Sequence, residues 1–159
     1  MYTNTGIVGI VVTALGAKSV VCTDLVNITH TTRHQVKNLA LQDHIQVVPL
    51  EWGNQSQTSH LASLHEYKPF DAIIASDLAA PLACADELIE TLKVLMKPNG
   101  GIREAWILLQ HHREFTEPFV SGIEHDSKFH LRQVPMTVLP EEFQSDRHSI
   151  YKLTTCDEW

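Results

Sequence analysis

The sequence predicts an α/β fold in which helices and strands alternate within a single domain. Apolar runs with the length of buried strands recur at 19–23, 45–50, 70–77 and 105–109. Segments with the apolar spacing of helices separate them, and the connections are short. Two further strands, 129–134 and 149–154, follow each other with no helix between them. This order predicts a sandwich with a mostly parallel sheet and a C-terminal antiparallel hairpin.

Helical spacing is expected in five segments: 6–16, 29–42, 60–67, 81–96 and 114–123. The fourth segment has an apolar face, and its charged residues occupy the opposite face: Asp86, Glu87, Glu90 and Lys93. The polar segments 51–56 and 135–147 are expected to be exposed connections. Arg103 and Glu104 are polar where the following strand is expected to be apolar already.

Composition limits the classes of protein that the chain can belong to. Its 159 residues are 43% hydrophobic, and a chain of this length buries about 68–70% of its unfolded surface, enough for one domain. The net charge is −7 and the basic residues are scattered, so nucleic acid is not an expected partner. The sequence has neither the ~20-residue apolar run of a membrane span nor a signal peptide, which predicts a cytoplasmic location, with the nucleus as an alternative.

The cysteines and histidines do not suggest a metal site. The three cysteines are far apart and lack Cys-x-x-Cys spacing, so each is expected to be a small apolar residue in a reducing compartment. The ten histidines show no ligand spacing with a nearby acid. We therefore expect no metal.

The segment from Gly6 to Asp24 indicates a nucleoside cofactor. It contains a glycine turn, a helix, a strand and then an acid at the tip of the strand. A small residue lets the backbone approach a ligand, and a helix N-terminus offers free N–H groups. A carboxylate at the end of the next strand can accept hydrogen bonds from two ribose hydroxyls.

Five motifs together resemble those of the seven-strand, S-adenosylmethionine-dependent methyltransferases. They are Thr5–Ile10, Thr23–Leu25, Leu50–Gly53, Phe70–Leu78 and Lys97–Gly101. The Leu-Glu-Trp-Gly and Ala-Ser-Asp-Leu pieces are similar, more narrowly, to the lysine methyltransferase-like group, the family-16 methyltransferases. The likeness extends over nearly the whole chain.

This resemblance implies that the chain binds S-adenosylmethionine and methylates a lysine side chain of a protein substrate. It implies cofactor contacts from Thr5, Gly6, Asp24, Leu25, Trp52 and Ser76. Among these, Gly6 lies beside the methionine part, Asp24 binds the ribose, and Trp52 lies against the adenine or its loop. Asp77 is expected on the substrate side, where it attracts the incoming cation.

The chain also departs from the family pattern. The family's first strand and its glycine-rich turn have no counterpart ahead of Gly6, so the first strand is expected to be missing or incomplete. That strand lies in the centre of the sheet, and its absence leaves two neighbouring strands with unpaired backbone groups. The family's aromatic residue after Leu78 is replaced by Ala79 or Ala80.

Alternative interpretations stay open at this stage. Gly6 and Gly9 can serve close helix packing alone, Asp24 can be a solvated strand end, Trp52 can cover the core, and Asp77 can cap a helix. The whole chain can be a non-catalytic binding module with a methyltransferase fold. A dehydrogenase-like nucleotide enzyme is a further alternative, although the Gly-x-Gly-x-x-Gly fingerprint is absent.

Overall fold

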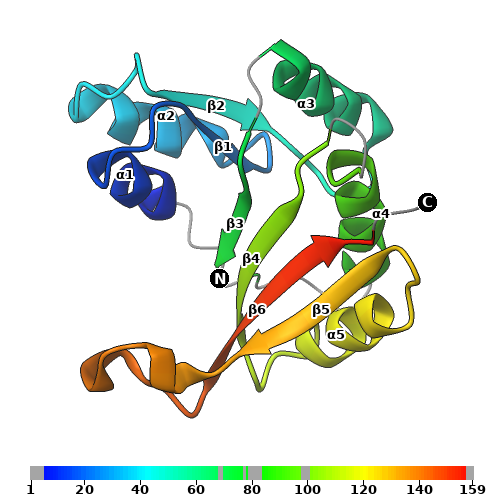
Figure 1. Cartoon of the computed structure of the whole chain (residues 1–159). Coiled ribbons are helices and arrows are strands. Elements are labelled where there is room, and N and C mark those ends of the chain that lie inside the picture. Colours follow the sequence, from blue (N-terminus) through cyan, green and yellow to red (C-terminus); the bar gives the residue numbers. More distant parts are fainter. Residues whose placement is uncertain (1–5, 68–69, 77, 79–83, 98–100, 157–159) are drawn as a thin grey trace.

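The computed structural model describes residues 6–67, 70–76, 78, 84–97 and 101–156. Its helices are α1 (Ile7–Ala14), α2 (Thr29–Asn38), α3 (Gln55–Tyr67), α4 (Ala85–Leu95) and α5 (Thr116–Glu124). Its strands are β1 (Val20–Asp24), β2 (Ile45–Pro49), β3 (Ile73–Ser76), β4 (Glu104–Gln110), β5 (Phe129–Val134) and β6 (His148–Thr155). The alternating order confirms the predicted α/β class (Figure 1).

The strands form two separate sheets. β1 and β2 pair in parallel, and the other four strands are ordered β3-β4-β6-β5. β3 and β4 are parallel, whereas β6 pairs antiparallel with both β4 and β5. The predicted C-terminal hairpin is therefore confirmed, with β6 placed inside the sheet and β5 at its edge.

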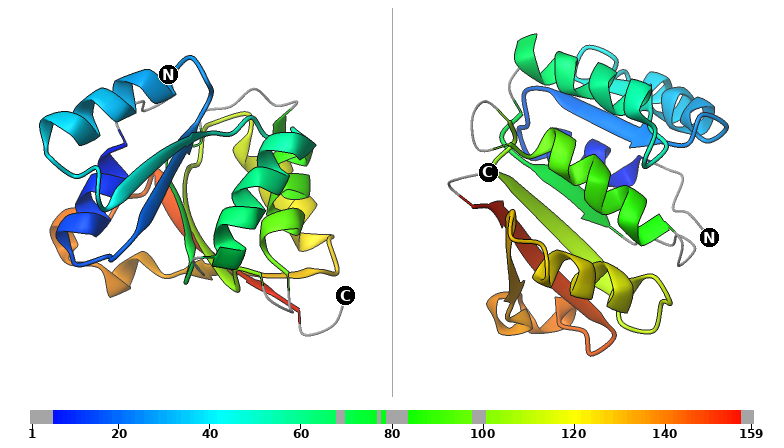
Figure 2. Two further views of the ribbon diagram at one scale, coloured as in Figure 1. Left: turned by 90° about the horizontal axis from the view of Figure 1, so that it is seen from above. Right: turned by 90° about the vertical axis from the view of Figure 1, so that its right-hand side faces the viewer.

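The division between the two sheets falls between β1 and β3. In Figure 2 (right) these two strands point the same way. Within the described residues, β1 pairs only with β2, and β3 pairs only with β4. Neither β1 nor β3 contains a fully buried residue, whereas every second residue of β4 is buried. The interruption lies where the resemblance predicts a missing strand.

The main core lies on one face of the four-stranded sheet, which α3, α4 and α5 cover (Figure 2). Buried residues of α4 pack there against buried residues of β4 and α5, among them Leu88, Ile89, Leu92, Ile107, Leu109, Phe119 and Ile123. α5 approaches α4 closely at Gly122, which has no side chain. A Cβ at this position would lie only 2.6 Å from Ile89 Cδ1. Burial of this apolar surface is the main stabilising contribution to the fold.

The clearest differences from the predicted helix boundaries are at the start of α3 and the end of α2; α1 and α5 differ by one or two residues at their ends. α3 begins at Gln55 instead of residue 60, because Asn54 caps it: its Oδ1 accepts a hydrogen bond from Gln57 N at 3.1 Å. Half of the polar segment assigned to a loop is thus a cap and a first helical turn. α2 ends at Asn38, earlier than residue 42, and Ala40 just beyond has a left-handed φ of 54°.

Glu104 does not delay the start of β4 as its polarity suggested. It is the first residue of the strand and lies opposite Thr154 of β6. Its carboxylate forms an ion pair with Lys152 and accepts a hydrogen bond from Trp106 Nε1 at 3.0 Å. A cross-strand lysine and a tryptophan of the same strand therefore satisfy the charge at the sheet surface.

Candidate functional site

The candidate site lies at the carboxyl ends of the parallel strands. β1 ends at Asp24, and the Asp24 carbonyl accepts a hydrogen bond from Leu50 N at 2.8 Å, which joins it to the end of β2. β3 ends at Ser76. Because β1 and β3 point the same way (Figure 2), these residues lie along one edge. Ligands of α/β folds bind at this edge of the sheet.

Gly6 begins α1 in a left-handed conformation with φ 60°. A Cβ at this position would lie 2.5 Å from Thr32 Cγ2 of α2, so a larger residue does not fit without movement of α2. The side of Gly6 where a side chain would project is therefore occupied by protein. Close packing accounts for the glycine. The backbone N–H groups of the first turn of α1 remain compatible with a cofactor contact.

Asp24 is half-buried at the tip of β1. Its Oδ1 accepts a hydrogen bond from Leu25 N at 2.8 Å. Burial raises the pKa of the Asp24 carboxyl above its ordinary value, while the Leu25 N–H bond opposes that rise. The backbone N–H of Leu25 thus orients the Asp24 carboxylate. The carbonyl of Leu25 accepts hydrogen bonds from Ile28 N and Thr29 N in the turn into α2.

Trp52 lies in the connection between β2 and α3, and its ring packs on the core. The centroids of Trp52 and Phe115 are 5.8 Å apart with the rings tilted by 35°. Phe115 is fully buried and stacks on Phe119. The structure thus gives Trp52 a covering role over the core, in the connection that follows the carboxyl end of β2.

Ser76 is half-buried at the end of β3, where it pairs with Leu108 of β4. Thr5 and Asp77, expected as a cofactor residue and as the substrate-side acid, lie outside the described residues. No hydrogen bond links the side chains of Asp24, Trp52 and Ser76 to one another within the described part of the chain. The fold brings these three to one edge without joining them into a network.

Glu87 belongs to this region as well, and its position in the sequence did not reveal it. It was expected on the solvent face of α4, but its Oε2 is buried and has no hydrogen-bond partner among the described residues. Its Cγ lies 3.0 Å from where a Cβ of Gly53 would be, next to Trp52. The acid faces the connection after β2, because that glycine lets the connection approach α4. Only the tertiary contact distinguishes Glu87 from its exposed neighbour Asp86.

Two surface hollows, of about 560 and 530 Å³, lie elsewhere. They are lined by the amino ends of β1 and β2 and by the last turns of α1 and α2, including Ser19, Lys37, Gly16 and His44. None of the candidate residues that the structure describes borders them. We place the candidate site at the carboxyl edge nonetheless, since that is where strand ends and helix N-termini converge.

The described residues contain no group of three or more histidine, cysteine or acidic side chains that could hold a metal ion. The three cysteines are free thiols, and all are half-buried. Burial raises the pKa of the Cys22 thiol. No helix within the described ranges is long and apolar enough to cross a bilayer.

Comparison with known families decides the identity of the fold. The sequence profile of a family described as "Lysine methyltransferase" matches residues 3–126. The chain belongs to this family. The match covers α1 to α5 and all the candidate residues, so the dehydrogenase interpretation is set aside. A search among curated proteins gave no match.

Solved structures with the same fold include other methyltransferases. A "putative rRNA-methylase" from Clostridium thermocellum has 13% sequence identity and a TM-score of 0.55, over 89% of this chain and 74% of its own. A "delta-N METTL16 MTase domain" has 13% identity and a TM-score of 0.60, over 98% and 69%. A Rossmann-superfamily protein from Streptococcus agalactiae has 14% identity and a TM-score of 0.57, over 97% and 59%. At these identities the likeness shows the fold alone, and this chain spans 59% to 74% of the three structures' lengths.

S-adenosylmethionine is the cofactor of this methyltransferase family, and the described residues offer acceptors for it. The half-buried Asp24 carboxylate suits hydroxyl donors. Oε2 of Glu87 is buried and, within the described ranges, has no donor to pair with, so it can accept a hydrogen bond from a ligand. Hydroxyl and amine groups of a nucleoside amino acid are donors of this kind. The residues at the carboxyl edge therefore fit the cofactor in the character of their polar groups.

Proposed function

We propose that this protein transfers a methyl group from S-adenosylmethionine to a lysine side chain of a protein. One observation supports the cofactor half most directly: Asp24, oriented by Leu25 N, ends β1 at the edge where the parallel strands terminate. The protein acceptor is supported by the description of the family. The net charge of −7 also favours a basic protein segment over nucleic acid.

The chain's own residues act mainly by position. The bound cofactor supplies an electrophilic methyl group on a sulfonium centre. Asp24 holds the ribose, and Trp52 shields the adjoining edge from water. Ser76, at the end of β3, lies where donor and acceptor meet, and Asp77 attracts the ammonium form of the lysine. Holding two reactants in contact can lower a barrier by ~7–11 kcal/mol. The lysine loses its proton to solvent before its nitrogen attacks, because only the neutral amine is nucleophilic.

Isothermal titration with S-adenosylhomocysteine tests the cofactor half of the proposal. The variant Asp24→Ala should weaken binding at least about tenfold, because a charge-assisted pair of hydrogen bonds is lost. Asp43→Ala is the matched control, since Asp43 is exposed just before β2 at the opposite edge. Equal affinities of the parent and the Asp24 variant would remove the ribose assignment.

Incubation with methyl-labelled S-adenosylmethionine tests the acceptor. Cell extract is treated with nuclease or with protease after the reaction, and protein hydrolysates are analysed for methyl-lysine. Label that survives nuclease and appears as methyl-lysine supports the proposal. Label that is lost with nucleic acid contradicts it.

A binding module with this fold is the second candidate, and the interrupted sheet favours it. The chain would then unfold cooperatively, and neither S-adenosylmethionine nor S-adenosylhomocysteine would change its melting temperature. A form of the protein extended upstream by a strand can be titrated in parallel. Cofactor binding by that form alone would show that a strand between β1 and β3 is required for the methyltransferase function.

A further inference from the structure

The connection between β5 and β6, residues 135–147, projects from the body of the molecule and is called the arm here. Figure 1 shows it as the orange segment beyond the ends of β5 and β6. It contains two short 3-10 turns, Met136–Val138 and Glu141–Phe143. The sequence indicated only an exposed connection at this place.

The arm is held in shape by its own hydrogen bonds. Each 3-10 turn begins after a proline, and Val138 N and Phe143 N donate to the carbonyls of Pro135 and Pro140 at 3.1 and 2.9 Å. Gln144 Nε2 donates to Leu139 O at 2.9 Å, which ties the two turns together. A surface that is already ordered loses little conformational entropy when a partner binds.

This ordered arm presents large apolar side chains to solvent. Val138 is 65% exposed and Phe143 is 67% exposed. Of the exposed large hydrophobic residues in the described part of the chain, Phe143 alone is aromatic. Aromatic side chains on a rigid surface are typical anchors of protein interfaces. The two 3-10 turns therefore expose apolar side chains that the rest of the described chain does not cover.

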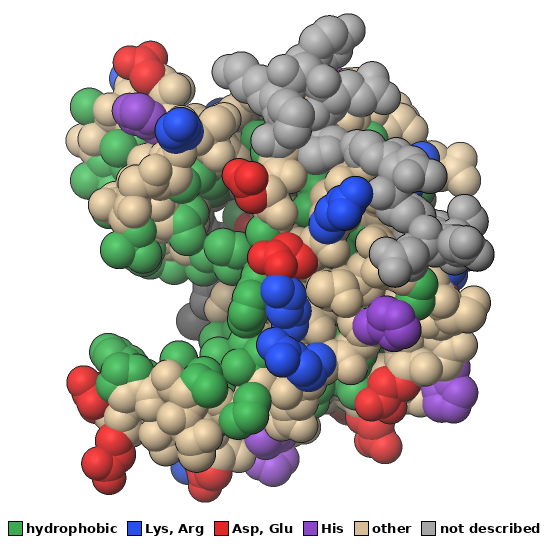
Figure 3. All heavy atoms as spheres, viewed as in Figure 1, with side chains coloured by type: hydrophobic (Ala, Val, Ile, Leu, Met, Phe, Trp, Pro, Cys, Tyr) green, Lys and Arg blue, Asp and Glu red, His purple; other side chains and the backbone are tan. Residues whose placement is uncertain are grey.

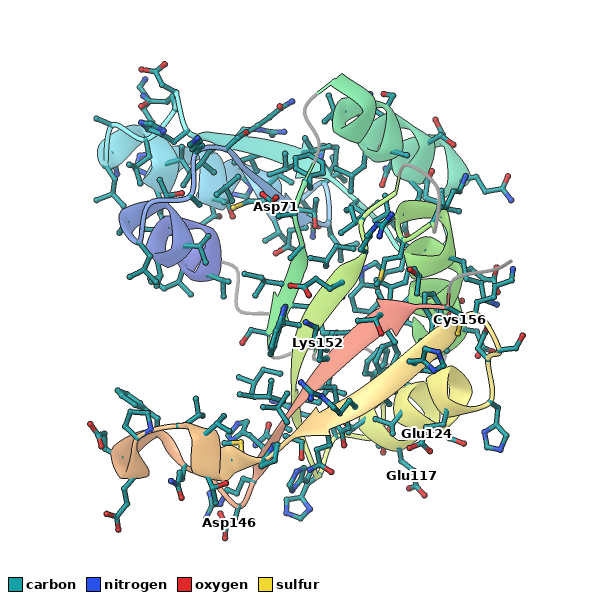
Figure 4. All side chains as sticks on the ribbon, in the orientation of Figure 1. Asp71, Glu117, Glu124, Asp146, Lys152 and Cys156 are labelled. Carbon is teal, nitrogen blue, oxygen red and sulfur yellow. The ribbon has the colours of Figure 1, made fainter. Side chains whose placement is uncertain are left out.

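The charges around these side chains select the kind of partner. Glu141 and Glu142 adjoin Phe143 in the second turn, and Asp146 follows, against one base, Arg147. All four are exposed. Figure 3 shows acidic and apolar side chains together on the lower left of the molecule, and Asp146 is labelled in Figure 4. An apolar centre with an acidic rim complements a segment that carries both lysines and apolar residues.

The arm lies at the same edge of the sheet as the candidate site. Ser76 of β3 pairs with Leu108 of β4, and Gln110, two residues further, pairs with His148 at the start of β6. The arm ends at Arg147, whose carbonyl accepts a hydrogen bond from His111 N at 2.9 Å. The arm therefore leaves the sheet at the edge where Ser76 lies, two strands away from it.

We propose that the arm is the docking surface for the lysine-containing segment of the protein substrate, with Phe143 and Val138 as apolar anchors and Glu141, Glu142 and Asp146 as the contacts for flanking lysines. This inference rests on the proposed protein-lysine function and names the chemistry of its substrate. It also locates substrate recognition on a segment separate from the cofactor residues.

Fluorescence anisotropy with a short, labelled peptide of alternating lysine and leucine tests the docking. The variants are Val138→Ser with Phe143→Ser for the anchors, and Glu141→Lys with Glu142→Lys for the rim. Glu117→Lys with Glu124→Lys is the charge control, because it changes the net charge equally on exposed residues of α5, away from the arm (Figure 4). Leu15→Ser with Leu39→Ser is the apolar control, at exposed positions after α1 and α2.

Both arm variants should weaken peptide binding at least about tenfold, while both controls stay within about twofold of the parent. A peptide of alternating lysine and serine should bind more weakly to the parent. The inference is overturned if the parent does not bind the peptide, if an arm variant binds as well as the parent, or if the α5 control loses as much affinity as the rim variant. Circular dichroism verifies that every variant is folded.

The binding assay needs neither cofactor nor transfer, so the two proposals can fail separately. Arm-dependent peptide binding without any methylation supports the docking surface and counts against the enzymatic function. Methyl transfer to protein lysines that is unchanged in the arm variants supports the function and overturns the docking surface.

Discussion

Gly9 of α1 lies directly against Cys22 of β1, so close that a Cβ on residue 9 would collide with the Cys22 Sγ. This contact sets the distance between the helix and the strand. The start of α1 is held in turn against α2, because a Cβ on Gly6 would meet Thr32. The packing of the Gly6–Asp24 segment therefore depends on two glycines that leave no room for a side chain.

Gly9→Ala should lower the free energy of unfolding by about 1–3 kcal/mol, because the added methyl group overpacks this contact. Cys22→Ala removes the Sγ that the methyl group meets. In that background the same substitution should cost less, or even stabilise through the better helix propensity of alanine. A double-mutant cycle by urea unfolding measures the coupling, and additive effects would show that the two side chains do not interact.

Asp24→Asn should stabilise the unliganded chain at neutral pH. Burial raises the pKa of the Asp24 carboxyl, so its ionised form is less favourable in the folded chain than in the unfolded chain. The favourable contribution of this group is complete below its unfolded pKa and is lost as pH rises through the raised, folded-state pKa. Melting temperatures of parent and variant should therefore differ at pH 7 and converge in acid. The opposite pH trend would contradict the burial of the carboxylate.

Lys152→Met should show the reverse pH dependence. The hydrogen bond from Lys152, and then the one from Trp106, lower the pKa of the Glu104 carboxyl. Stability from that pair is present above the unfolded pKa of Glu104 and lost as pH falls through the lowered value. Lys152 also lies 4.8 Å from the centroid of the Trp106 ring. Because the pair is partly exposed, the loss at pH 7 should stay below about 1 kcal/mol, and it should fade in acid melts.

Glu87→Gln should weaken cofactor binding. Oε2 of Glu87 is buried and has no hydrogen-bond partner among the described residues, so it can accept a hydrogen bond from the cofactor, and a charged acceptor binds a donor more strongly than an amide oxygen does. Asp86→Asn is the control, because it removes an exposed charge from the same first turn of α4. Titration with S-adenosylhomocysteine is the readout, and thermal melts verify that both variants are folded. Equal affinities of the two variants would show that Oε2 of Glu87 does not contact the cofactor.

Hydrogen exchange should distinguish the strands at the interruption of the sheet. β4 and β6 pair on both sides, whereas β1 and β3 pair on one side within the described residues. Every second amide of β1 and β3 is expected to exchange quickly, and those of β4 to exchange slowly. Uniformly slow exchange along Val20–Asp24 and Ile73–Ser76 would show that these edges are covered in solution.

Local patterns were sufficient for most of the fold. The apolar runs around Val21, Ile73 and Ile107 predicted strands, and the C-terminal hairpin followed from two strands with no helix between them. The helix start at Gln55 was missed, because the Asn54 cap and the polar turn after it also resemble a loop. The partner of Glu104 was missed because Lys152 is far along the chain and adjacent only through strand register.

The sequence by itself determined the α/β class, the family resemblance and the acid at the end of β1, since these depend on periodicity and on short ordered motifs. Only the tertiary structure decided that Gly6 and Gly9 pack against Thr32 and Cys22. It also decided that the Glu87 side chain packs beside Gly53 with its Oε2 buried, and that the arm presents Phe143 outward. These features arise from contacts between segments that are distant in the chain, and local patterns carry no information about which distant surfaces meet.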